Sequence, residues 1–135
     1  MAPPKGPPRV RLLLPPEPVS ARNGRKFLRA QVAAWHLGVD ADQLDVLELL
    51  TSELITNSLV HARSELEVTA YHDQRGLRVT VSDLDSRRPV LFPQDVGALG
   101  GRGLALVGAL ADDWGVDDLP DGKAVWFRLR VAKGA

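Results

Sequence analysis

Four stretches of the chain alternate apolar and polar residues, which is the period-2 pattern of half-buried β-strands. They cover residues 10–14, 66–70, 77–82 and 125–131. The tripeptide Gln74-Arg75-Gly76 predicts a tight turn, so the second and third stretches are expected to form an antiparallel hairpin. A further short strand is expected over residues 114–119, before a turn at Pro120-Asp121-Gly122.

Apolar residues at helical spacing predict three helices. The first opens at Pro18 or Ser20, runs to about Trp35 and ends at residues 36–38. The second begins after Asp40 or Asp42, either of which can cap it, and runs to residue 62. The third covers residues 103–112, after a long loop over 84–101 that is typical of a lid or a disordered segment. This order of elements predicts an α/β two-layer sandwich, with an antiparallel or mixed sheet and helices on one face.

The 135 residues suit a single domain, and proline usage sets its boundary. Seven of the ten prolines lie in residues 1–18, so residues 1–8 are expected to be a disordered tail before a domain over 9–131. No apolar run approaches the length of a membrane span or of a signal peptide, which favours a cytoplasmic protein. The chain has no cysteine, which excludes disulfides, thiolate metal sites and a cysteine nucleophile.

The formal net charge of zero conceals an uneven distribution. Residues 1–36 carry seven basic residues and one acidic residue, whereas residues 37–62 carry five acidic residues and no Lys or Arg. This pattern fits either two oppositely charged faces of one domain or a surface arranged for a protein partner. A nucleic-acid partner for the basic segment is disfavoured, since no nucleic-acid-binding motif accompanies it.

The second helix carries a polar stripe within its apolar face. Glu53, Asn57 and His61 are spaced i, i+4, i+8, so they project from one side of the helix. Burial of an unpaired carboxylate is costly, which suggests that the stripe lines a pocket holding water, metal or ligand rather than a self-satisfied network. The apolar residues expected in the core are Val46, Leu47, Leu49, Leu50, Leu54 and Val60, and those expected on the solvent face are Asp45, Glu48, Ser52, Thr56 and Arg63.

Two further polar features stand near predicted element ends. Asp83 shares strand parity with Leu77, Val79 and Val81, so its carboxylate either points inward, where it could accept from a ligand amine, or caps a turn. The sequence GGRGL at residues 100–104 directly precedes the third helix. Glycines beside a helix N-terminus suit a phosphate, although they also occur in a plain loop. Neither a Walker A motif nor a dinucleotide-binding fingerprint is present.

Together these segments resemble the GHKL ATPase superfamily. The sequence ELITNSLVHA at residues 53–62 looks like its N box, SD at 82–83 like the start of its first glycine box, and GRGLAL at 101–106 like its second. The chain is most similar to the small branch related to anti-sigma-factor serine/threonine kinases, especially the ATP-binding regulatory proteins of actinobacteria. The resemblance covers about residues 9–131 and implies a Bergerat, or histidine-kinase-like ATPase, fold.

The resemblance also implies roles for individual residues in binding ATP with Mg²⁺. Glu53 would be the general base, and Asn57 would bind the Mg²⁺ that bridges the phosphates. Asp83 would accept from the adenine amino group, and His61 would lie beside the nucleotide. The segment Gly101, Arg102, Gly103 and Leu104 would form the base of the lid and contact phosphates. Such chemistry rests on positioning and charge neutralisation.

The same resemblance implies a protein kinase that binds a sigma factor in one state and phosphorylates an antagonist in another, with a homodimer expected. Three differences from the family favour an alternative, a nucleotide-gated adaptor without catalysis. Residues 83–87 read DLDSR where the family reads D-x-G-x-G. Leu99 stands where related kinases often carry an Arg, and Ala124 stands where a Thr often follows Gly-Lys and helps hold the base.

Overall fold

The computed structural model describes residues 9–61, 64–83, 99–120 and 122–133; for residues 61, 99–104, 132 and 133 the description is limited to the backbone. The described elements are, in chain order, β1 (Val10–Leu14), α1 (Val19–Ala34), β2 (Leu37–Gly38), α2 (Ala41–His61), β3 (Leu66–Asp73), β4 (Gly76–Asp83), α3 (Leu99–Leu110), β5 (Asp113–Leu119), β6 (Gly122–Leu129) and β7 (Ala132–Lys133). Within these ranges, no helix combines the length and the apolar character needed to cross a membrane.

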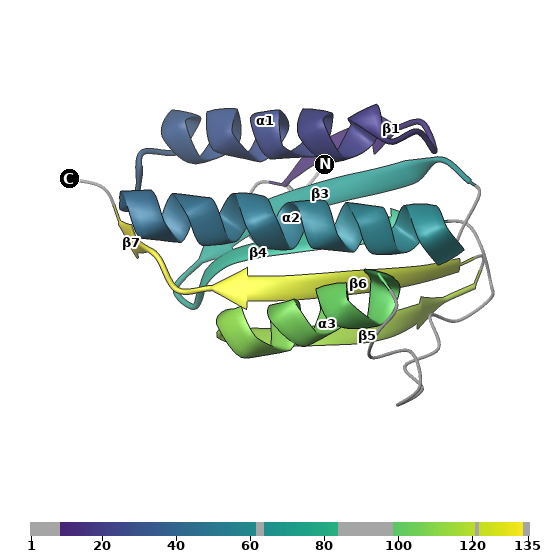
Figure 1. Cartoon of the computed structure of the whole chain (residues 1–135). Coiled ribbons are helices and arrows are strands. Elements are labelled where there is room, and N and C mark those ends of the chain that lie inside the picture. Colours follow the sequence, from purple (N-terminus) through teal and green to yellow (C-terminus); the bar gives the residue numbers. More distant parts are fainter. Residues whose placement is uncertain (1–8, 62–63, 84–98, 121, 134–135) are drawn as a thin grey trace.

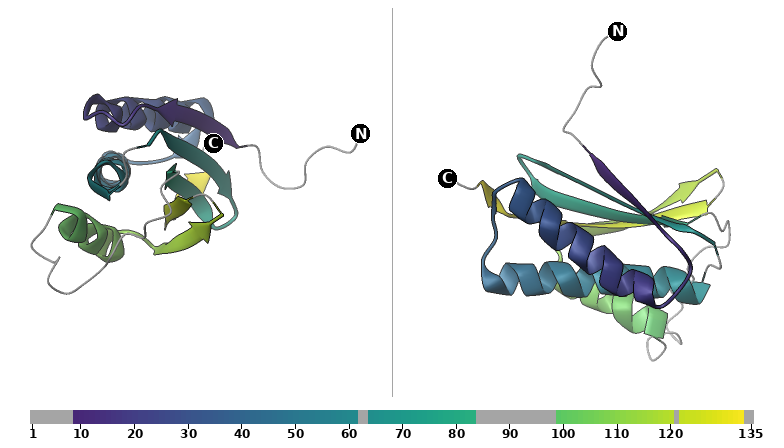
Figure 2. Two further views of the ribbon diagram at one scale, coloured as in Figure 1. Left: turned by 90° about the vertical axis from the view of Figure 1, so that its right-hand side faces the viewer. Right: turned by 90° about the horizontal axis from the view of Figure 1, so that it is seen from above.

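Five strands form one sheet in the order β1-β3-β4-β6-β5, and every neighbouring pair is antiparallel. The three helices lie side by side on one face of this sheet (Figures 1 and 2). The predicted two-layer sandwich is therefore confirmed. Strands β2 and β7 pair as a separate two-stranded sheet that the sequence pattern did not predict.

The core lies between the sheet and the helices. The hairpin strands contribute the alternating residues that the pattern predicted, such as Leu77, Val79 and Val81, and each of them is buried. Helix α1 contributes Leu28 and Val32. Because every second residue of a strand faces the helices, the alternation of the sequence fixes which side of the sheet is dry.

Asp40 caps helix α2, which decides between the two predicted caps. Its carboxylate accepts the backbone N–H of Gln43 at 2.8 Å, and the Gln43 side chain accepts the backbone N–H of Asp40 at 3.1 Å. This reciprocal pair is a capping box, which satisfies two donors at the start of the helix. The side-chain amide of Gln43 also donates to the backbone carbonyl of Arg130, so the cap ties α2 to the end of β6.

The predicted faces of α2 are partly wrong. Leu49 and Val60, which were assigned to the core, are 39% and 54% exposed. Part of the assigned solvent face instead packs against α1, where the Ser52 hydroxyl accepts a hydrogen bond from Arg25 at 2.7 Å. The helix lies between α1 and α3, and the sequence alone did not reveal which flanks those neighbours would cover (Figure 1).

The boundaries near the glycine segment also differ from those predicted. Helix α3 begins at Leu99, so Gly100 to Gly103 form its first turns rather than a loop in front of it. Glycine lowers helix propensity, which explains why the sequence predicted a later start at Gly103. Most of the predicted loop, residues 84–98, and the predicted tail, residues 1–8, lie outside the described residues.

The uncovered face of the sheet carries charged and aromatic side chains that pair with one another. Arg11 and Glu67, on neighbouring strands, are 2.5 Å apart, and the hydrogen bond and charge of Glu67 raise the pKa of Arg11. The Arg78 guanidinium lies 4.1 Å from the ring centre of Trp126. These contacts pair the charged and aromatic groups with one another on the face of the sheet opposite the helices, outside the core.

Gly76, at the start of β4, is predicted to tolerate no side chain. Its φ of +116° disfavours residues with a Cβ, and an added Cβ would press against the carbonyl oxygen of Leu129 and lie 2.9 Å from the Cα of Arg130. Replacement by Ala is expected to lower the free energy of unfolding by about 2 kcal/mol. Urea unfolding measures this, with Gln74→Ala as the control, since that exposed turn residue should change stability by less than about 0.5 kcal/mol.

Candidate functional site

The predicted site residues gather at one end of the sandwich. The second half of α2, the end of β4, the start of β6 and the start of α3 all lie at the right-hand side of Figure 1. Helix α2 packs against α3 within the helical layer and also contacts β4 and β6 of the sheet, so it connects the two layers. Residues separated by up to 70 positions in sequence are therefore brought together by the antiparallel topology.

Asn57 is the most unusual polar residue of this region. Its side chain is 1% exposed, and neither its amide nitrogen nor its amide oxygen has a hydrogen-bond partner among the described residues. The hydroxyl of the neighbouring Ser58 is likewise buried without a described partner. Unsatisfied buried amides cost about 1–3 kcal/mol, so they are rare in native proteins and require an explanation. A self-satisfied polar network, one of the two interpretations of the stripe, is thereby disfavoured at Asn57.

Glu53 lies one helical turn before Asn57 and is only partly buried. Among the described residues it forms no ion pair or hydrogen bond, so its carboxylate is available to an incoming group. His61 continues the same stripe along α2, but its side chain lies outside the described residues. The stripe therefore has an accessible carboxylate at one end and a buried amide behind it.

Asp83 points inward, as strand parity predicted, and it is 2% exposed. Its carboxylate Oδ2 lies 3.3 Å from the ammonium Nζ of Lys123, and both side chains are about 1% exposed. The two residues face each other directly across the β4–β6 pairing. Asp83 is thus part of a buried ion pair, and a turn that it could cap would involve residues outside the described part of the chain.

Lys123 was not predicted from the sequence, in which the contact beside the base was expected at position 124. Ala124 pairs with Ser82, whose side chain does not share the parity of Asp83. The signal was present in the strand alternation, since Lys123 has the same parity as the buried residues Val125 and Phe127. Position 124 therefore projects to the face opposite that of Asp83, and the effect of Ala124 on binding a base stays a prediction.

The glycine segment supplies backbone groups to the same end. Gly101, Arg102, Gly103 and Leu104 all belong to the first turns of α3, and their side-chain surroundings lie outside the described residues. The first four backbone N–H groups of a helix have no partner within the helix, and the dipole makes this end electropositive. Such an end suits an anion, although by itself it does not define one.

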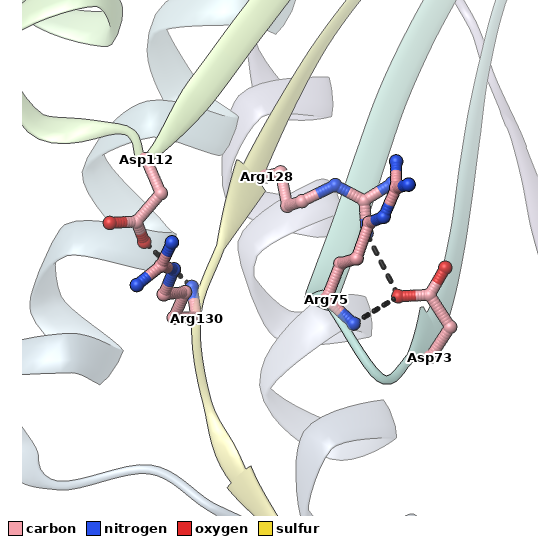
Figure 3. A network of polar contacts seen from close by, with 5 residues as sticks. All are labelled: Asp73, Arg75, Asp112, Arg128 and Arg130. Atoms are coloured by element: carbon pink, nitrogen blue, oxygen red, sulfur yellow. Dashed lines mark hydrogen bonds and ion pairs between the residues drawn. The ribbon is translucent and has the colours of Figure 1, made fainter.

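A hollow of about 630 Å³ lies at the opposite end of the sheet, but the carboxylates of Asp73 and Asp112 beside it are already engaged. Asp73 accepts from the Arg128 side chain at 2.9 Å and from the backbone N–H of Arg75 at 2.8 Å, and both contacts are drawn in Figure 3. Asp112 accepts the backbone N–H of Arg130 at 2.7 Å. Asp73 ties the hairpin turn to β6, and Asp112 ties the α3–β5 connection to the end of β6, so the hollow is better explained by strand-end packing than by a site.

Comparison with known proteins identifies the family of the chain. Residues 14–129 match the model of a family described as the histidine kinase-like ATPase domain. The chain is 33% identical over 122 residues to the serine-protein kinase RsbW of Listeria monocytogenes serovar 1/2a, and the match covers 78% of this chain and 76% of the relative. The protein of the same name from Listeria innocua serovar 6a is 32% identical with the same coverage.

A solved structure shares the fold. The crystal structure of the RsbU and RsbW domains of Rv1364c from Mycobacterium tuberculosis superposes with a TM-score of 0.68 at 20% sequence identity. The match covers 95% of this chain and 34% of the other, so this chain spans about one third of that longer protein. At this level of identity the likeness establishes the architecture and not the chemistry.

Proposed function

Because the chain belongs to the histidine kinase-like ATPase domain family, we propose that it binds ATP with Mg²⁺ and acts as a serine/threonine protein kinase. Membership confirms the resemblance to the GHKL ATPases found in the sequence. In the proposed pathway the protein binds a sigma factor in one state and phosphorylates an antagonist protein in another. The relatives named serine-protein kinase support the reaction type, and the homodimer remains a prediction.

The unpartnered amide of Asn57 is the observation that carries this proposal. Its oxygen is a neutral ligand of the kind that Mg²⁺ accepts, and burial without a protein partner is tolerable if a ligand completes the contact. Among the described residues no three acidic or histidine side chains converge into a metal site. A single amide oxygen fits a metal that takes its other ligands from water and from nucleotide phosphates.

In this proposal different residues of the chain remove the proton, bind the base and contact the phosphates. Bound Mg²⁺ supplies charge neutralisation at the phosphates. Glu53, partly exposed and one turn from Asn57, accepts the proton of the attacking hydroxyl as the phosphoryl group moves to that oxygen and ADP departs. Asp83 accepts from the adenine amino group, and the first turns of α3, which include Gly101 to Leu104, contact the phosphates through the free backbone N–H groups at the helix start. His61 lies beside the nucleotide with no assigned chemical step.

Replacing Asn57 tests this assignment directly. Asn57→Ala is expected to weaken ATP–Mg²⁺ binding by about 100-fold, because loss of the amide oxygen removes the proposed protein ligand of the metal. Without nucleotide the variant should lose less than about 1 kcal/mol of stability, since it also removes two unsatisfied buried groups. Calorimetry with ATP and Mg²⁺ measures the first effect, and urea unfolding measures the second.

Ser58→Ala is the matched control. It removes a buried, unpartnered hydroxyl from the adjacent position of the same helix, and we expect ATP–Mg²⁺ affinity to stay within about twofold of wild type. Equal affinity of the Asn57→Ala variant and wild type would refute the metal-binding role. Absence of ATP binding by wild type would refute the nucleotide-dependent function altogether.

The adaptor without catalysis is the second candidate function. It is favoured by residues 83–87, which read DLDSR in place of the glycine-containing segment of the family. In that case ATP would bind and alter the affinity for a protein partner, and no phosphate would be transferred. Tight ATP binding without turnover in the presence of antagonist proteins would support the adaptor over the kinase.

A further inference from the structure

The buried ion pair between Asp83 and Lys123 lies at the end of an otherwise apolar row of inward-facing residues on β4 and β6. Its neighbours along the two strands, Val81 and Val125, form an apolar pair at the next inward position. Two charges taken out of water carry a desolvation cost of several kcal/mol each, and replacing a buried ion pair by apolar residues is often neutral or stabilising. A charge pair that persists at the end of a dry face therefore points to a binding role.

Each member of the pair offers one kind of hydrogen bond. The Asp83 carboxylate is an acceptor, and the Lys123 ammonium is a donor with three N–H groups. The atoms Oδ2 and Nζ lie 3.3 Å apart, so acceptor and donor stand next to each other where the end of β4 pairs with the start of β6. A ligand that matches them must present a donor beside an acceptor on one edge.

We propose that Lys123 donates a hydrogen bond to ring nitrogen N1 of adenine while Asp83 accepts one from the 6-amino group. This inference rests on the proposed nucleotide site. The adenine edge presents an N–H donor and the N1 acceptor side by side, which complements the pair. Lys123 is thereby a specificity-determining residue of the site. Because an ammonium has three donors, it can keep its contact with Asp83 and still donate to the base, so neither charge is left unpaired by binding.

The test combines ligands that lack one hydrogen-bonding group with protein variants that lack its proposed partner. Calorimetry compares ADP–Mg²⁺ with 1-deaza-ADP, which has a C–H in place of N1, and with the 6-desamino analogue; diphosphates avoid turnover. Wild type should bind 1-deaza-ADP about 10- to 100-fold more weakly than ADP, the range expected for a lost hydrogen bond to a charged donor. Lys123→Met should bind 1-deaza-ADP and ADP with nearly equal affinity, a ratio near one. It should still bind the 6-desamino analogue more weakly than ADP.

A second variant covers the possibility that Lys123→Met fails to fold. Lys123→Gln retains an N–H donor without the charge, and its ratio should fall to a few-fold. A wild-type ratio near one, or an unchanged ratio in both variants, would overturn the role of Lys123 while ADP binding itself upholds the proposed function. Tighter ADP binding by Lys123→Met would also overturn it, because Lys123 would then be masking Asp83. If wild type binds no ADP or ATP, both inferences fail.

Discussion

Replacement of Asp83 by Asn is expected to lower the free energy of unfolding by about 3–5 kcal/mol. The variant leaves the Lys123 ammonium 1% exposed and deprives it of the carboxylate that lies 3.3 Å away. Burial leaves the ammonium little hydration, and loss of a close carboxylate removes part of the compensation for it, so the folded state becomes less favourable. Urea unfolding at pH 7 measures the loss, which is a large fraction of the stability of an ordinary domain.

The control is the same substitution in an exposed ion pair of the neighbouring strand. Asp117 lies 3.7 Å from Arg78, and the two side chains are 58% and 25% exposed, so water already screens the pair. Asp117→Asn is therefore expected to change stability by less than about 1 kcal/mol. Equal losses for the two variants would contradict the view that burial makes the Asp83–Lys123 pair sensitive.

A double variant separates the loss of a partner from the loss of the pair. Asp83→Leu combined with Lys123→Met removes both charges and should recover most of the stability lost in Asp83→Asn. The same double variant should not bind adenine nucleotides, because it lacks the carboxylate and the ammonium that are proposed to contact the base. Recovery of stability together with unchanged nucleotide binding would show that adenine does not bind at Asp83 and Lys123.

The parts of the fold that follow from local pattern could be predicted from the sequence. Alternation in residues 66–70 and 77–82 predicted the hairpin and the inward direction of Asp83, because parity within one strand is a local property. The polar stripe on α2 likewise predicted that Asn57 would lie on a buried face. The sequence offered two aspartates as the cap of α2. In the structure Asp40 is the cap, since it exchanges hydrogen bonds with Gln43.

What could not be predicted depended on partners distant in sequence. Lys123 faces Asp83 only because β6 pairs with β4, and those strands are separated by α3 and β5. Leu49 and Val60 were assigned to the core because a helical pattern gives an apolar side but not the positions of the two flanking helices. The β2–β7 pairing, two residues long on each side, carries too little pattern to be recognised.

Glu53→Gln is expected to reduce phosphate transfer by about 100- to 10,000-fold while leaving ATP–Mg²⁺ affinity within about threefold of wild type. The amide keeps the size of the side chain but cannot take the proton of an attacking hydroxyl. Because Glu53 is partly exposed and makes no described polar contact, its replacement should not disturb the fold. The measurement follows radiolabelled γ-phosphate from ATP to water and to candidate antagonist proteins.

Glu48→Gln is the matched control, since Glu48 is an acidic residue of the same helix that lies 3.6 Å from Arg29 of α1. It faces away from α3, toward α1, so phosphate transfer should be unchanged within about twofold. If Glu53→Gln transfers phosphate at the wild-type rate, Glu53 is not the base. If wild type binds ATP–Mg²⁺ but transfers no phosphate to any acceptor, the adaptor becomes the better account, and the buried amide of Asn57 would then serve nucleotide binding alone. Loss of transfer in Glu53→Gln with retained binding, set against an unaffected Glu48→Gln, would assign proton removal to one carboxylate of the polar stripe.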